Sequence, residues 1–288
     1  MTPGHETSQP RAFLDTTVPA ERILSSKDRR RLLEGNLAGY SARLSSRFVQ
    51  FEFKRGPYRH IVRFQADAES GMSYADLDKQ ARRFAAMPPT RWQRRAGSVV
   101  VRMLELFLEQ GLRTTVRPGR PVPAEELVLG LLRDFLRLFV RNAWPRAFEG
   151  ICTFIDPSGC LGDLPEPRWD EGSSTMDNSL PRRYARSKVP ELAAYVRSEA
   201  PTFERIAAAL KGLPNDPRDR ETPHRIRAIE KILLQKEDPD DTDIRRVGDA
   251  LIAVECPADH VLLNGNTRHF DPIAHALGKT SKSCWVAS

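Results

Sequence analysis

The sequence predicts an α/β protein whose sheet is built from the two ends of the chain. Residues 11–15, RAFLD, form a short apolar segment typical of a first buried strand. Near the other end, the apolar run VLL (261–263) leads directly into NGN (264–266), the pattern of a buried strand that stops at a turn. Between these ends the apolar residues recur at helical spacing. We therefore expect a parallel sheet flanked by helices, interrupted by a large all-helical insertion.

The first elements follow from capping residues and glycines. After Pro19, the segment SSKDRRRLLEG (25–35) predicts a helix that Ser25 or Ser26 caps and Gly35 closes. Residues 39–56 predict a short strand that turns into a helix ending at Gly56.

The middle of the chain carries helical periodicity. Five segments show it, separated by proline-rich connectors: 73–87, 97–111, 124–144, 189–212 and 222–236. β-branched alternation is scarce there, so we expect residues 60–235 to be the helical insertion. Residues 1–59 and 236–288 would then form the two parts of the α/β core.

The last elements are a helix, a strand and a second helix. In residues 241–256, Ile244, Val247, Leu251 and Val254 repeat at spacings of three and four, which predicts one apolar helix face. The VLL strand follows, and Pro272 is expected to start a final short helix.

Composition narrows the classes of function. The 45 Lys and Arg residues against 38 Asp and Glu give a net charge of +7, which suits a polyanionic partner but equally an ordinary basic surface. No run of 18 apolar residues and no secretory pattern is present, and four cysteines do not make a disulfide framework. We therefore expect a cytoplasmic protein without a membrane span. The absence of a P-loop or GxGxxG sequence argues against a nucleotide-dependent enzyme.

Four polar residues stand beside buried apolar sequence in the two end segments. Asp15 closes the first strand, Glu52 interrupts an aromatic helix, Asp249 is an acid within the apolar segment VGDALIAVEC, and Asn266 follows the last strand. Polar residues at the carboxyl ends of parallel strands are where α/β sheets bind ligands. Carboxylates beside apolar sequence are costly to bury without a cation, and Mg²⁺ is a cation that such groups hold.

Ordinary local roles are the alternative to a shared site. Asp15 is followed by two threonines, which is common turn and cap chemistry. Glu52 precedes Arg55 by three residues, and Asp249 follows two arginines, so each acid can pair on its own helix. Asn266 beside a glycine is a frequent turn residue.

Three segments resemble the PIN-domain family, metal-dependent ribonucleases that include the toxins of many toxin–antitoxin systems. FLDTTV (13–18) resembles the family's first strand, and SSRFVQFEFKRG (45–56) resembles its segment with a glutamate on the following helix. GDALIAVEC (248–256) with HVLLNGNTRHFDPI (260–273) resembles the closing helix and strand, including the 17 residues from Asp249 to Asn266. The resemblance covers about residues 11–56 and 241–279.

The resemblance implies an endoribonuclease that uses Mg²⁺ or Mn²⁺. The metal would lower the pKa of a bound water and neutralise charge on the phosphodiester. The implied partners are RNA, an antitoxin or other protein, and a second copy of the chain. The implied catalytic and metal-binding positions are Asp15, Glu52, Asp249 and Asn266.

Further residues near these positions are candidates for supporting roles. Thr17, Asp243 and Asp271 are secondary, or second-tier, candidates for the site. Thr17 would orient a carboxylate or a metal-bound water. The expected contacts to substrate phosphates are Lys54, Arg55, Arg268 and His269. Asn266 stands where the family often has an acid, so a catalytically silent PIN-like module that binds RNA or protein is the alternative. A helical interaction protein whose end segments match by chance is a second one.

Overall fold

A five-stranded parallel sheet forms the centre of the computed structural model, with strand order β3-β2-β1-β6-β7. The structure describes residues 9–77, 79, 82, 91–110, 125–177, 182–214, 219–235 and 238–286. The strands are β1 (Arg11–Leu14), β2 (Ala42–Ser46), β3 (Thr153–Ile155), β6 (His260–Asn264) and β7 (Thr280–Ser283). The two ends of the chain therefore share one sheet, as the sequence predicts.

β1 is the central strand of the sheet, and both of its faces are covered. Ala12, Phe13 and Leu14 are all fully buried, and alternate residues point into different apolar clusters. Phe13 joins the larger cluster, whereas Ala12 and Leu14 join a smaller one. In register, Phe13 lies between Leu44 of β2 and Leu262 of β6.

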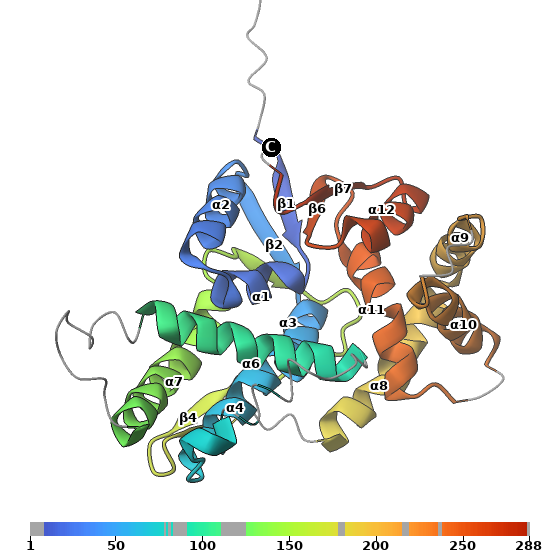
Figure 1. Cartoon of the computed structure of the whole chain (residues 1–288). Helices are drawn as coiled ribbons and strands as arrows, with labels where there is room; N and C mark the ends of the chain where they lie inside the picture. Colours follow the sequence, from blue (N-terminus) through green and yellow to red (C-terminus); the bar gives the residue numbers. More distant parts are fainter. Residues whose placement is uncertain are drawn as a thin grey trace, which may run out of the picture.

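Helical segments cover the sheet and extend beyond it (Figure 1), and twelve of them have well-defined bounds. The first six are α1 (Thr17–Leu24), α2 (Lys27–Ala38), α3 (Arg47–Phe53), the π-helical segment η1 (Lys54–Tyr58), α4 (Arg59–Glu69) and α6 (Arg91–Gln110). The others are α7 (Glu125–Ala147), α8 (Arg182–Ser198), α9 (Ala200–Lys211), α10 (Glu221–Leu234), α11 (Asp241–Glu255) and α12 (Thr267–Ala276).

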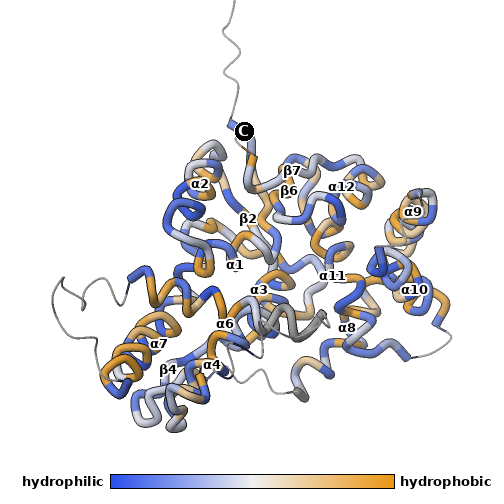
Figure 2. Tube along the Cα trace, viewed as in Figure 1, coloured by the Kyte–Doolittle hydropathy of each residue, from blue (hydrophilic) through white to orange (hydrophobic). Residues whose placement is uncertain are grey.

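Two groups of helices lie on either side of α3 (Figure 1). One group contains α4, α6 and α7, which contact one another, and the other contains α8, α9, α10 and α11. Figure 2 shows α7 as largely hydrophobic, whereas α2 carries mainly hydrophilic residues. None of the described helices combines the length and apolar character that crossing a membrane would require.

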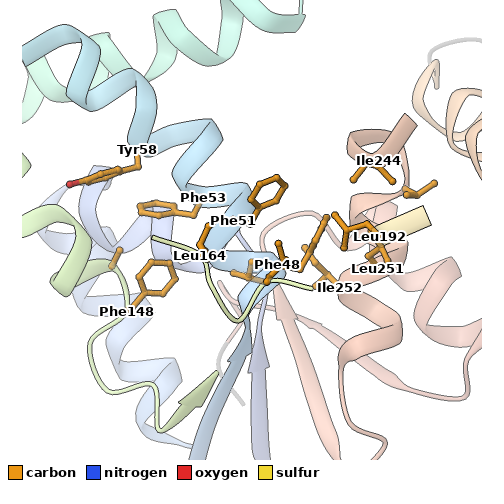
Figure 3. Close-up of a cluster of buried hydrophobic side chains, with 14 of the residues drawn as sticks. Phe48, Phe51, Phe53, Tyr58, Phe148, Leu164, Leu192, Ile244, Leu251 and Ile252 are labelled. Carbon is orange, nitrogen blue, oxygen red and sulfur yellow. The ribbon is translucent and has the colours of Figure 1, made fainter. Parts of the chain in front are cut away.

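Aromatic and aliphatic side chains of α3 connect the two groups (Figure 3). Phe53 contacts Phe148 edge to face at a ring-centroid distance of 5.2 Å. Phe48 and Phe51 belong to the same fully buried cluster as Leu251 of α11. Burial of this kind contributes about 2 kcal/mol for each large side chain, so the position of α3 between the groups is strongly fixed.

The middle of the chain is not all helical, which corrects the sequence prediction. β3 lies within residues 60–235 yet pairs with β2, with Leu44 opposite Thr153. A hairpin of β4 (Arg168–Asp170) and β5 (Thr175–Asp177) lies in the same region. Each of these strands has only three residues, which is too short for the alternation that identifies a strand from sequence.

Several predicted boundaries also differ. The second helix continues through Gly35 to Ala38, and α1 and β7 were not expected at all. The chain remains helical beyond Gly56, although Gly56 itself takes non-helical angles (φ −103°, ψ −108°) and forms a kink before Pro57. The last helix begins at Thr267, with Pro272 inside it. Most of the predicted helix 73–87 lies outside the described residues.

Candidate active site

A cleft of about 440 Å³ lies at the carboxyl ends of β1 and β6. Its lining includes residues of the helical segments α1, α3, η1, α6, α10, α11 and α12. The four predicted site residues, Asp15, Glu52, Asp249 and Asn266, all line it, although they come from positions up to 251 residues apart (266 − 15). The fold thus brings together the residues that the sequence singled out.

Asp15 is a buried carboxyl group, only 2% exposed. Its backbone N–H donates to the carbonyl of Leu263 (3.1 Å), so the residue extends the pairing of β1 with β6. Burial raises the pKa of Asp15 to about 8; the negative charge of Asp249 raises the pKa further, while hydrogen bonds from Thr17 lower it. No lysine, arginine or histidine pairs with Asp15 in the part of the chain that the structure describes.

Thr17 orients the Asp15 carboxylate, as expected. Its hydroxyl and its backbone N–H both donate to Asp15 Oδ1, at 2.6 and 3.1 Å. The same hydroxyl accepts from the N–H of Gly265 (2.6 Å). A Cβ at position 265 would lie 2.9 Å from Thr17 Oγ1, so this close approach requires a glycine. Asp15 is therefore tied to the turn after β6 as well as to α1.

Glu52 enters the cleft from α3, whose other residues are mainly buried aromatics. The hydroxyl of Thr16 donates to Glu52 Oε2 (2.9 Å). On the other side, a Cβ at Gly248 of α11 would lie 2.3 Å from Glu52 Oε1. Gly248 therefore leaves the space that the Glu52 carboxylate occupies.

Asp249 lies one residue after Gly248 and forms an ion pair with Arg225 of α10. His269 Nδ1 lies 3.6 Å from the same carboxylate oxygen, Oδ2. Arg225 is 3% exposed, and its Nε also donates to the carbonyl of Arg246 (3.3 Å). Arg225, which pairs with Asp249, thus comes from the middle of the chain.

Asn266 is exposed at the rim of the cleft and starts α12. Its carbonyl accepts from the N–H groups of His269 (3.0 Å) and Phe270 (3.2 Å). Its own N–H donates to Asn264 Oδ1 (2.9 Å). Asn266 therefore acts as a turn residue and also lies beside the cleft.

Of the predicted phosphate contacts, Arg55 and His269 line the cleft. Lys54 does not: it is 1% exposed and donates to the carbonyl of Pro165, and burial lowers its pKa to about 8. Arg268 lines a separate hollow with residues of α9 and α10. The predictions for Lys54 and Arg268 are therefore wrong for this cleft, because neighbouring positions on a helix point in different directions.

The two second-tier acids also lie elsewhere. Asp243 is buried at the first turn of α11, where it forms a capping box with Asp240 and an ion pair with Lys231 (2.9 Å). Asp271 is exposed on α12 and is not among the described residues that line the cleft. Asp243 thus stabilises a helix terminus, and neither acid adds carboxylate density to the cleft.

Sequence reasoning missed Arg225, Arg246, His60 and Gly248, which face or shape the cleft. A signal for Arg225 existed, because it shares the spacing of the buried residues Ala228, Ile229 and Ile232 and so lies on the apolar face of α10. A glycine inside an apolar helix was the corresponding signal for Gly248.

The donors of the cleft fit a hard divalent cation in their chemistry. Asp15 is a desolvated carboxyl group without a cationic partner, and Glu52 and Asp249 line the same space. As the side chains stand, no three His, Cys, Asp or Glu residues within the described ranges are arranged around one metal position. Arg225 is already paired with Asp249, so full coordination would require that pair to rearrange.

Comparison with protein-family models, with curated proteins and with solved structures finds no match for this chain. The fold and the cleft therefore define the class by themselves: an α/β protein with a five-stranded parallel sheet and, at its carboxyl edge, a cleft lined by both carboxylates and arginines.

Proposed function

We propose that the chain is a PIN-like, metal-dependent endoribonuclease whose active site is the cleft at the carboxyl edge of the sheet. The observation that carries the proposal is Asp15, a buried carboxyl group without a cationic partner among the described residues, which shares its cleft with Glu52 and Asp249. In this reading residues 9–59 and 238–286 form most of the core. The middle of the chain elaborates it and adds β3 to its sheet.

Asp15, Glu52 and Asp249 would hold Mg²⁺ or Mn²⁺, with Asn266 at the rim. When bound, such an ion supplies Lewis-acid charge to the phosphodiester and makes water more acidic. Asp15 must give up its proton for this role, which its pKa of about 8 permits when a cation compensates the charge.

The chain's own residues set the geometry of these carboxylates. Thr17 fixes the orientation of Asp15, and Thr16 with Gly248 fixes that of Glu52. His269 Nδ1, 3.6 Å from Asp249, is placed to hold or deliver a proton beside the acids. Because these contacts join α1, α3, α11 and α12, small movements of one helix would disturb the whole site.

The test is cleavage of single-stranded RNA by the purified full chain with Mg²⁺ or Mn²⁺ and, separately, with EDTA. We expect cleavage only with metal, and a loss of about 100-fold or more on Asp15→Asn or Glu52→Gln, as is usual for removal of a charge-stabilising group. Asp271→Asn is the matched control, because this acid is exposed outside the cleft lining, and it should cleave like the wild type. Equal activity in all three variants would contradict the proposal.

The alternative, a catalytically silent module, is favoured by one observation. Arg225 is paired with Asp249, which a metal ion would need as a ligand. A protein that binds single-stranded RNA but cleaves none with either metal would support this alternative. A calorimetric titration with Mn²⁺ separates the two further, because the active enzyme must bind the ion through Asp15.

A further inference from the structure

Two arginines that line the cleft each have a guanidinium nitrogen without a hydrogen-bond partner. Arg55 Nη2 and Arg225 Nη1 are both buried, and neither has an acceptor in the part of the chain that the structure describes. Buried N–H donors are nearly always satisfied, and leaving one unpaired costs about 1–3 kcal/mol. The two nitrogens therefore lack hydrogen-bond acceptors among the described residues, and a ligand bound in the cleft would supply them.

Each guanidinium is held firmly on its other side. Arg55 Nη1 donates to Asp241 Oδ1 (2.7 Å), and the guanidinium carbon lies 4.8 Å from the centre of the Phe51 ring. Arg225 is fixed by Asp249 and by the carbonyl of Arg246. Both side chains are therefore ordered before any ligand binds, which reduces the entropy lost on binding.

The surroundings of these two arginines carry further positive charge. Arg245, Arg246, His60 and His269 line the same cleft. The acids of the cleft lie among these cations, because Asp249 is paired with Arg225 and the charge of Glu52 acts on Arg55. Such an arrangement matches a ligand that has both an anionic group and a reaction centre next to it.

We propose that Arg55 and Arg225 contribute to a phosphate-binding subsite beside the carboxylates of the cleft. Guanidinium N–H groups donate charge-assisted hydrogen bonds to phosphate oxygens, and each of these arginines has one nitrogen, unpartnered within the described chain, for such a bond. The subsite takes a phosphate of the RNA backbone adjacent to the one at the carboxylates. That assignment of RNA as the carrier rests on the proposed function, whereas phosphate binding itself does not.

The experiment measures binding without metal, so that it is independent of cleavage. Fluorescence anisotropy of a labelled single-stranded RNA is recorded in EDTA, with inorganic phosphate and a nucleoside 5′-monophosphate as competitors. The variants are Arg55→Lys and Arg225→Lys, which keep the charge beside Asp241 and Asp249 but remove the unpartnered guanidinium nitrogen. Arg102→Lys is the control, because that arginine is exposed on α6 and pairs with Glu105 outside the cleft.

We expect each cleft variant to bind RNA about 10-fold more weakly or worse, from the loss of a charge-assisted hydrogen bond, while the control binds like the wild type. Circular dichroism melting shows whether each variant is folded. Because arginine and lysine have the same charge, a general attraction to a basic surface would leave all three variants unchanged, and that result would overturn the subsite.

The outcome is separable from that of the cleavage assay. Wild-type protein that cleaves RNA while both cleft variants keep full affinity would refute the subsite and leave the nuclease proposal intact. A protein that cleaves nothing while both variants lose affinity would support the subsite and refute the nuclease. Inorganic phosphate should compete weakly and RNA strongly; a nucleoside monophosphate that competes better than RNA would overturn the RNA assignment.

Discussion

Asp15 and Asp249 line the same cleft, but within the described chain only Asp249 has a positively charged side chain against its carboxylate. At the junction of β1 and α1, Asp15 is surrounded by buried chain and is hydrogen-bonded only by neutral groups, and burial raises its pKa to about 8. At the contact of α10 and α11, Asp249 has a guanidinium against it. Near neutral pH the first carboxyl group is therefore largely protonated, whereas the second is an ion pair.

For the proposed metal site, the difference indicates which carboxyl group a cation would stabilise more. A carboxyl group that carries a proton for lack of a cation can exchange that proton for a metal ion. A carboxylate that already has an arginine gains less from a second cation. Asp15 is thus the residue on which metal binding should depend most strongly.

The largest expected effect is on the pH dependence of stability at Asp15. The folded pKa of about 8 exceeds the ordinary 3.8, so the folded state binds the extra proton and the free energy of unfolding falls as pH rises from about 4 to 8. Asp15→Asn imitates the protonated group and removes this term. At pH 9 it should be more stable than the wild type by on the order of 5 kcal/mol.

Urea denaturation from pH 4 to 9 measures this effect. Adding Mn²⁺ at pH 9 should raise the free energy of unfolding of the wild type but leave that of Asp15→Asn unchanged. Parallel pH profiles for the two proteins would show that Asp15 is ionised in the folded state.

A smaller effect is expected at the ion pair. Asp249→Ala leaves the buried Arg225 without its carboxylate and should lower the free energy of unfolding by about 3 kcal/mol. Arg225→Ala should cost a similar amount. The double variant should lose clearly less than the sum, because each single change strands a charge. Additive losses in urea denaturation would show that the two residues act separately.

The smallest effect concerns the Thr17 hydroxyl, which hydrogen-bonds both to Asp15 after β1 and to Gly265 after β6. Thr17→Val removes the hydrogen bonds to Asp15 and from Gly265, and should cost about 1–2 kcal/mol of unfolding free energy. It should also raise the pKa of Asp15, because the lost bond lowers that pKa. Thr17→Ser keeps the hydroxyl and is the matched control. A serine variant as unstable as the valine variant would assign the effect to the methyl group instead.

The sequence predicted the parts of the cleft that depend on adjacency in the chain. Asp15 directly follows β1 and Asn266 lies two residues after β6, and parallel strands present their carboxyl ends at one edge, so their approach could be expected. Glu52 was recognisable as a lone acid in a buried aromatic helix. Thr17 was recognisable from its place two residues after Asp15.

The parts that depend on distant packing could not be predicted. Arg225 reaches Asp249 because α10 packs against α11, and no local pattern states which helices become neighbours. Lys54 and Arg55 are adjacent in sequence, yet one is buried against Pro165 and the other lines the cleft. β3 gains its identity only by pairing with β2, since its own three residues carry too little pattern.

The register of the central strand has a consequence for how the protein is made. Leu14 of β1 pairs with Leu263 of β6, which the ribosome adds 249 residues later (263 − 14). At a synthesis rate of roughly 5–20 residues per second, that interval lasts about 12–50 s. Throughout it, the hydrogen-bonding edge of β1, a strand with three buried apolar residues, has no partner on that side. The nascent chain therefore exposes this edge throughout the interval, and the cleft can form only after β6 has emerged from the ribosome.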